Sequence, residues 1–181
     1  MTETYPNLSG VNFESFVDGE GVRATIYLSG CSHNCPGCHN PQAHDPLAGA
    51  SLSLEDIKSI ASEINKRPYL TGITLSGGDP FFNTNKTANF LLALLGFIEK
   101  DNLTIWIYTG FCFKDILQIE SQSARKLLSL TDVLVDGPFI QSLASKTLKF
   151  RGSSNQRIID VQKTLEKGEI VIHSSQEETT A

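Results

Sequence analysis

Apolar and polar residues follow one another in blocks along this chain of 181 residues, and the blocks predict alternating strands and helices. Short apolar runs rich in β-branched and aromatic residues predict strands at residues 22–29, 73–75, 103–109 and 132–136. Apolar residues spaced three and four apart predict helices at residues 54–66, 87–100 and 121–130. Residues 156–161 and 169–173 are also expected to be extended.

Strands that alternate with helices predict right-handed crossover connections and a largely parallel sheet, so the expected fold class is α/β. The units are too few to close an eight-fold barrel. Residues 13–173 are expected to form a single domain. Residues 1–12 show no periodicity and are expected to be a flexible arm, and the polar residues 174–181 are expected to be a disordered tail.

Composition narrows the classes of protein that this chain can belong to. A formal net charge of −5 argues against a protein that binds nucleic acid without sequence preference. The longest apolar run, Phe90 to Ile98, is much shorter than the roughly 20 residues that cross a bilayer. We therefore expect a cytoplasmic protein with neither nucleic-acid nor membrane partners.

Three cysteines, Cys31, Cys35 and Cys38, follow the first predicted strand with the spacing C-x3-C-x2-C. Thiolates this close repel one another unless a cation neutralises them, and a disulfide would leave the third thiol unused. Three sulfurs can hold three corners of a [4Fe-4S] cluster and leave the fourth iron open to a chelating substrate. The alternative is a structural zinc knot, with His33 or His39 as the fourth ligand.

Three more strand ends carry residues that suit either a site or a simple turn. Gly77 and Gly78, followed by Asp79, could form a turn or let the backbone approach a ligand. Thr109 could donate a hydrogen bond or only end its strand. Asp136 could act in the site or only shape the turn that follows.

Two other features stay without a role at this point. Cys112 lies far from the three clustered cysteines in the sequence and is expected to be a plain thiol. The loop Arg151 to Gln156 has the donors to hold a carboxylate, although it could equally be a solvated loop.

Five segments together resemble the radical S-adenosylmethionine (SAM) superfamily and, within it, the activating proteins of anaerobic ribonucleoside-triphosphate reductases. They run in the family order and are Asp18 to Arg23, Cys35 to Cys38, Leu75 to Pro80, Leu134 to Phe139 and Arg151 to Gln156. The cysteine motif alone would indicate only the superfamily. The resemblance implies a single-domain, open, partial (β/α) barrel of the radical SAM type.

The resemblance also implies cofactors and their ligands. Cys31, Cys35 and Cys38 would bind a [4Fe-4S] cluster, and its open iron would bind SAM. The segment Gly77, Gly78 and Asp79 would receive the amino group of SAM, and Thr109 would face its ribose or carboxylate. Backbone atoms of Gly37, Cys38 and His39 would contact the adenine.

The activity implied is reductive cleavage of SAM to a 5'-deoxyadenosyl radical, which removes a hydrogen atom from a glycine of the large reductase subunit. An external electron donor such as flavodoxin would reduce the cluster. Because the cofactors carry out the chemistry, no side chain is assigned as catalytic. An activating enzyme of the pyruvate formate-lyase type is the alternative enzyme, and a non-catalytic, zinc-stabilised binding module is the alternative of a different class.

Overall fold

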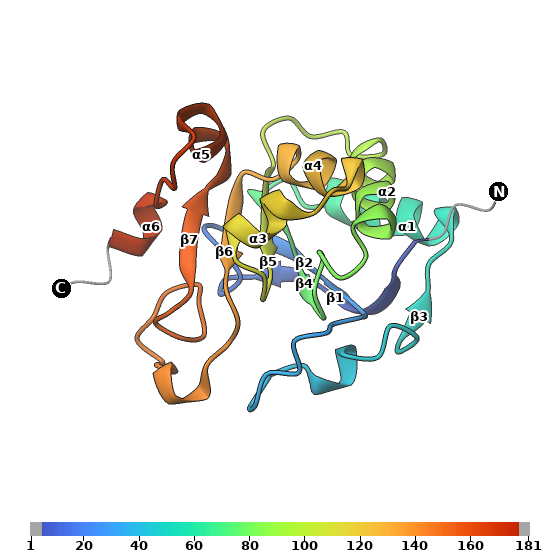
Figure 1. Ribbon diagram of the computed structural model, residues 1–181. Helices are drawn as coiled ribbons and strands as arrows, with labels where there is room; N and C mark the ends of the chain where they lie inside the picture. The colour runs from blue at the N-terminus through green and yellow to red at the C-terminus, as the bar shows by residue number, and fades with distance from the viewer. Residues whose placement is uncertain (1–4, 178–181) are drawn as a thin grey trace.

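A seven-stranded sheet with the order β3-β1-β2-β4-β5-β6-β7 forms the centre of the protein (Figure 1). The structure is a computed structural model and describes residues 5–177. The four central strands are parallel, whereas β1, β3 and β7 each run antiparallel to a neighbour. The α/β class and the open, largely parallel sheet are therefore confirmed. The strands are β1 (Asn7–Ser15), β2 (Arg23–Leu28), β3 (Ala50–Ser51), β4 (Gly72–Gly77), β5 (Thr104–Tyr108), β6 (Val133–Asp136) and β7 (Arg157–Asp160).

The helices α1, α2 and α4 cover one face of this sheet, at the top of Figure 1. Ser53 begins α1 with a capping box, in which its side chain and that of Asp56 each bond the other's backbone. None of the helices between residues 5 and 177 has the length and apolar character needed to span a bilayer. The helices are α1 (Leu54–Asn65), α2 (Thr84–Leu95), α3 (Phe113–Gln118), α4 (Gln122–Ser129), α5 (Val161–Lys167) and α6 (Ser174–Glu177), with 3-10 turns η1 (Pro41–Ala43) and η2 (Gln141–Leu143).

The two faces of the sheet differ in chemistry because successive side chains of a strand point to opposite faces. Ile26, Leu75 and Ile107 belong to the large apolar core, which also contains most of the buried residues of α1, α2 and α4. The residues that alternate with them, such as Tyr27 and Ser76, are largely polar and belong to the other face. That second face is free to carry a binding site.

Arg23 fastens the amino-terminal ends of three parallel strands on this polar face. Its side chain is fully buried and lies 5.2 Å from the centre of the Trp106 ring. The guanidinium donates to Thr74 Oγ1 (2.7 Å), to the Ile73 carbonyl (2.9 Å) and to the Thr104 carbonyl (2.7 Å). Burial lowers the pKa of Arg23 to about 10. Arg23 therefore has a structural role at the end of the sheet opposite the cysteines.

In the amino-terminal arm expected at residues 1–12, residues 7–12 belong to a strand. Asn7–Ser15 forms β1 and pairs with β2, so tertiary pairing supplies the order that this segment's weak periodicity did not predict. Residues 1–4 lie outside the described residues. Of the tail expected at 174–181, residues 174–177 form α6, and residues 178–181 again lie outside.

Several element boundaries also differ from the sequence prediction. The short helices α3 and α5 were not predicted, and α2 begins at Thr84 because Asn83 caps it. Residues 169–173, which were expected to be extended, pair with β7 through an isolated bridge between Ile172 and Ile159. The prediction failed where helices span two turns or fewer, too few residues for a periodic pattern.

Candidate cofactor site

An open cavity of about 820 Å³ lies at the carboxyl ends of β2, β4 and β5, on the face of the sheet without the large helices. Tyr27, Ser76 and Tyr108 contribute its floor from these three strands. The cysteine loop and residues 148–152 contribute its walls. In Figure 1 these two segments lie below the sheet, in light blue and orange respectively. Parallel strands commonly carry their functional loops at this edge.

The cysteine loop leaves β2 at Gly30, which has a positive φ of 105°. Backbone bonds hold the start of this loop against η1, from Gly30 N to Ala43 O (2.8 Å) and from Cys31 N to His44 O (3.1 Å). Cys31, Cys35 and Cys38 all line the cavity, all are partly exposed, and none is in a disulfide. The structure therefore brings the three predicted ligands together as free thiols at one cavity.

The thiols of this loop can be compared with the needs of the two alternatives that the sequence left open, a [4Fe-4S] cluster and a structural zinc knot. Burial is the main cause that raises the pKa of the Cys31 thiol, so a positively charged partner is needed to hold the thiolate. Among residues 5–177, no three His, Cys, Asp or Glu side chains lie close enough together to hold a single metal ion. A cluster that receives each sulfur at a different iron atom fits the three thiols.

Asp79, directly after β4, joins the ends of β4 and β5 through its buried carboxylate. Thr109 Oγ1 donates to Oδ1 (2.9 Å), Phe81 N donates to Oδ1 (2.8 Å), and Gly110 N donates to Oδ2 (2.8 Å). The Asp79 side chain is 1% exposed. Asp79 and Thr109 both line the cavity, and their side chains are bonded to each other.

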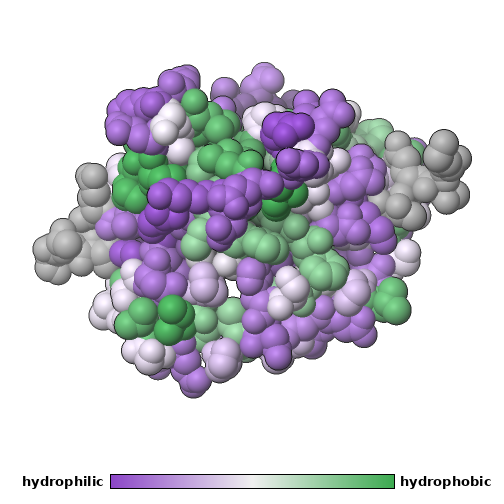
Figure 2. All heavy atoms as spheres, viewed as in Figure 1, coloured by the Kyte–Doolittle hydropathy of each residue, from purple (hydrophilic) through white to green (hydrophobic). Residues whose placement is uncertain are grey.

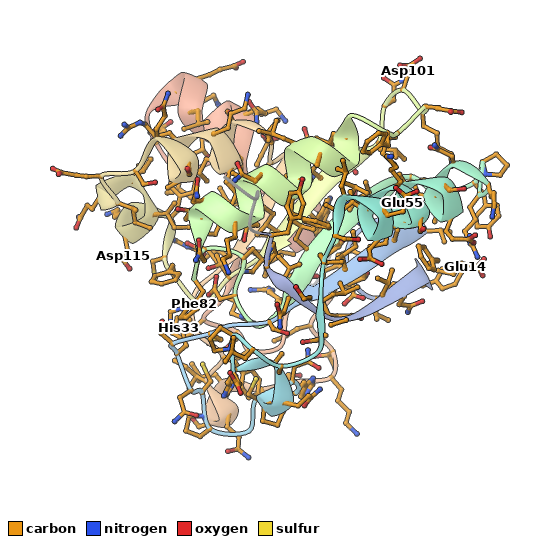
Figure 3. The ribbon with its side chains drawn as sticks, turned by 90° about the vertical axis from the view of Figure 1, so that its right-hand side faces the viewer. Glu14, His33, Glu55, Phe82, Asp101 and Asp115 are labelled. Atoms are coloured by element: carbon orange, nitrogen blue, oxygen red, sulfur yellow. The ribbon has the colours of Figure 1, made fainter. Side chains whose placement is uncertain are left out.

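His33 connects the cysteine loop to this carboxylate. Its Nε2 atom lies 3.0 Å from Asp79 Oδ2, and its ring packs edge-on against Phe111 at 4.4 Å between centres. The contact with Asp79 raises the pKa of the His33 imidazole, and burial opposes this change. Figure 3 shows His33 and Phe82 at the same end of the molecule, with Glu55 and Asp101 at the other end. His33 therefore lies where the cysteine loop meets the ends of β4 and β5.

Gly77 and Gly78 are required because of protein backbone that lies against them. A Cβ on Gly77, which has a φ of 100°, would lie 2.5 Å from the Leu28 carbonyl oxygen. A Cβ on Gly78 would collide with the Gly30 carbonyl oxygen and lie 2.8 Å from that of Ala43. The glycines thus allow the β4 loop to pack directly on the start of the cysteine loop, a role in addition to the turn or ligand approach that the sequence predicts.

Gly78→Ala should displace the cysteine loop, because the new methyl group meets backbone oxygens that cannot rotate away. We expect the unfolding free energy to fall by about 2 kcal/mol, the usual cost of overpacking, and iron incorporation to fall with it. Urea unfolding and iron analysis after anaerobic reconstitution measure the two effects. Gly96→Ala is the control: Gly96 has a φ of −65°, and its Cβ would lie no closer than 3.4 Å to a neighbour. An unchanged iron content in Gly78→Ala would contradict this account.

Not all of the other residues singled out in the sequence line the cavity. His39 lines it and lies 5.9 Å from the Phe139 ring, measured between ring centres. Gly37, with a φ of 74°, is exposed and faces Gln141 instead of the cavity. Cys112 does not line the cavity and immediately precedes α3.

Asp136 belongs to a structural ion pair. Arg157 binds it with two nitrogens, Nε at 2.9 Å from Oδ1 and Nη2 against Oδ2. Phe113 N, at the start of α3, also donates to Oδ2 (2.8 Å). The pair links β6, β7 and α3.

Several cavity residues were not predicted from the sequence. Phe16 and Val17 line the cavity although 69% and 73% of their surface is exposed. Tyr27 and Tyr108 point to the cavity face because side chains alternate along β2 and β5. This alternation could have identified them only if the face covered by the helices were known. Asp18, which also lines the cavity, accepts a bond from Tyr27 OH (3.2 Å); burial, followed by this carboxylate, raises the pKa of Tyr27 to about 12.

Comparison with known proteins identifies the domain. The family model of a 4Fe-4S single cluster domain matches residues 17–159, which include the three cysteines and nearly all of the cavity. The match covers most of the chain. The cysteine loop is therefore part of an iron–sulfur cluster domain.

Curated relatives agree with one another in name. An anaerobic ribonucleoside-triphosphate reductase-activating protein of Enterobacteria phage T4 is 37% identical over 146 residues, 79% of this chain and 86% of the relative. The proteins of the same name from Vibrio cholerae and Escherichia coli K12 are 38% and 36% identical, over 78% and 77% of this chain and 90% and 89% of theirs. The chain therefore belongs to the family of anaerobic ribonucleoside-triphosphate reductase-activating proteins.

Proposed function

We propose that this protein is a radical SAM enzyme that generates the glycyl radical on the large subunit of an anaerobic ribonucleoside-triphosphate reductase. The observation that carries the proposal is one cavity lined by three free thiols and by the Gly77-Gly78-Asp79 loop, in a chain of this family. The open, largely parallel sheet is consistent with the partial (β/α) barrel of that superfamily.

Residues around the cavity fit the two cofactors. Cys31, Cys35 and Cys38 supply three thiolates, which leaves the fourth position of a [4Fe-4S] cluster for SAM. Arg151 lines the same cavity, and its Nε donor is buried without a hydrogen-bond partner among the described residues, so it suits the carboxylate of SAM. When reduced by an external donor, for which we propose flavodoxin, the bound cofactors supply reductive cleavage of SAM and hydrogen abstraction from glycine.

The remaining residues of the site position and shield these cofactors. Gly77 and Gly78 hold the β4 loop against the cysteine loop, and Asp79 fixes the ends of β4 and β5 in place. Backbone groups of Cys38 and His39 are proposed to contact the adenine. Gly37 lies beside them and allows the loop to turn with its positive φ.

Anaerobic reconstitution with iron and sulfide tests this function. The purified protein should become brown, convert SAM to 5'-deoxyadenosine under a strong reductant, and produce a glycyl-radical doublet in the EPR spectrum of the reductase. A parallel reaction with pyruvate formate-lyase should give no doublet. A colourless protein that retains zinc and leaves SAM intact would refute the proposal.

A further inference from the structure

An open groove leads away from the cofactor cavity along one side of the cysteine loop. It has a volume of about 530 Å³ and is lined by Pro36, Phe139, Ile140, Gln141 and Ser142. Phe139 also lines the main cavity, so the groove and the cavity meet at this residue. A chain lying in the groove would therefore be led toward the cysteines.

Apolar side chains border this groove and remain exposed. Ile140 is 37% exposed and Leu143 is 42% exposed, and every residue from 140 to 147 is exposed. Figure 2 shows hydrophobic residues gathered on the lower part of the molecule, in the region of η2. Scattered apolar residues are ordinary on protein surfaces, but a group beside a groove indicates a contact site.

The charge of the same segment differs from that of the whole chain. No acidic residue occurs between Asp136 and Asp160, whereas Lys146 and Lys149 lie there. The chain as a whole has a formal net charge of −5. A local cationic segment on an acidic protein favours a partner that carries carboxylates.

The Arg151 to Gln156 loop holds this surface in place. Ser153 Oγ accepts from Ile140 N (3.1 Å), Ser154 N donates to the Leu143 carbonyl (3.0 Å), and Asn155 Nδ2 donates to the Pro138 carbonyl (2.8 Å). A surface that is ordered before binding loses less entropy when a partner docks. These bonds give a structural role to a motif that the sequence left unassigned.

We propose that the groove and the adjoining residues Leu143 and Lys146 dock an extended, acidic segment of the reductase, which carries apolar side chains into the groove and carboxylates toward Lys146. The inference rests on the proposed function, because it concerns how the protein substrate of that function reaches the cavity. Hydrophobic contact gives the segment affinity, and the lysine favours its approach.

Leu143→Asp tests the apolar part of this surface, with Leu165→Asp on α5 as a matched control, since Leu165 is 44% exposed. The reconstituted protein is titrated with the purified reductase under anaerobic conditions, and SAM cleavage is measured without reductase. Leu143→Asp should raise the Kd by about tenfold, as at a central contact residue, and leave SAM cleavage by the isolated protein unchanged. Leu165→Asp should change neither.

Lys146→Glu tests the charge, with Lys114→Glu on α3 as its control. It should raise the Kd and weaken its dependence on salt, whereas Lys114→Glu should leave both unchanged.

Equal Kd values for Leu143→Asp and Leu165→Asp would overturn the inference. It would also be overturned if Leu143→Asp altered the mass of the free protein in solution without altering the Kd, since the groove would then contact a second copy. If the unmodified protein fails to cleave SAM or to form the glycyl radical, the proposed function fails instead. The two failures are therefore distinguishable.

Discussion

Cys35→Ala should reduce SAM cleavage by at least about 1000-fold, because the three cysteines of the loop act as one unit and removing one member of such a unit removes most of its effect. Cys35 lies between the other two thiols in the sequence, and all three line the same cavity. The measurement is the 5'-deoxyadenosine formed after anaerobic reconstitution, together with the iron content of the protein.

Cys112→Ala is the matched control for this substitution. Cys112 is the fourth cysteine of the chain, is partly exposed, and does not line the cavity. This variant should bind iron and cleave SAM as the unmodified protein does. Normal cleavage by Cys35→Ala, or loss of cleavage in Cys112→Ala, would contradict the assignment of the three ligands.

Asp79→Asn should lower the unfolding free energy by about 3 kcal/mol, the cost of losing charged hydrogen bonds and burying donors without an acceptor. The carboxylate accepts from Phe81 N, Gly110 N and Thr109 Oγ1. An amide of the same size has only one acceptor oxygen, so its NH₂ group must face donors. Urea unfolding of the reduced, iron-free protein, followed by the fluorescence of Trp106, gives the change.

Asp101→Asn makes the same chemical change at an exposed position, at the end of the molecule opposite His33 (Figure 3). It should change the unfolding free energy by less than about 0.5 kcal/mol. Comparable losses in Asp79→Asn and Asp101→Asn would show that the buried carboxylate does not join the strand ends.

Much of the fold could be predicted because many of its strands and helices depend on residues that are close in the sequence. The strands around Ile26, Leu75 and Ile107 were predicted because each is a short buried run next to a turn. The helix at residues 54–66 was predicted from its apolar spacing, and Ser53 begins it because its side chain satisfies a free backbone N–H. By contrast, β1 could not be predicted, since its order depends on pairing with β2 in space and not on its own periodicity.

The sequence indicated which residues share the cavity better than it indicated which partners their side chains bond. Among the proposed residues, the cysteines, His39, Gly77, Gly78, Asp79 and Thr109 all line one cavity, because each follows a strand whose end lies at the same edge of the sheet. Their bonding partners were not predictable. That Asp79 contacts Thr109 and His33, or that Gly78 packs on Gly30, depends on the spacing of neighbouring strand ends, which no single segment encodes.

The one-sided arrangement of the large helices has a consequence for the working enzyme. Within residues 5–177, α1, α2 and α4 all lie on the opposite face, so none of these three helices covers the cavity. On the proposed function, the reductase would supply the missing cover, and a sealed compartment would exist only while the two proteins are assembled. The enzyme alone should cleave its sulfonium cosubstrate without forming a glycyl radical. In the assembled pair, each cleavage should be coupled to one radical formed.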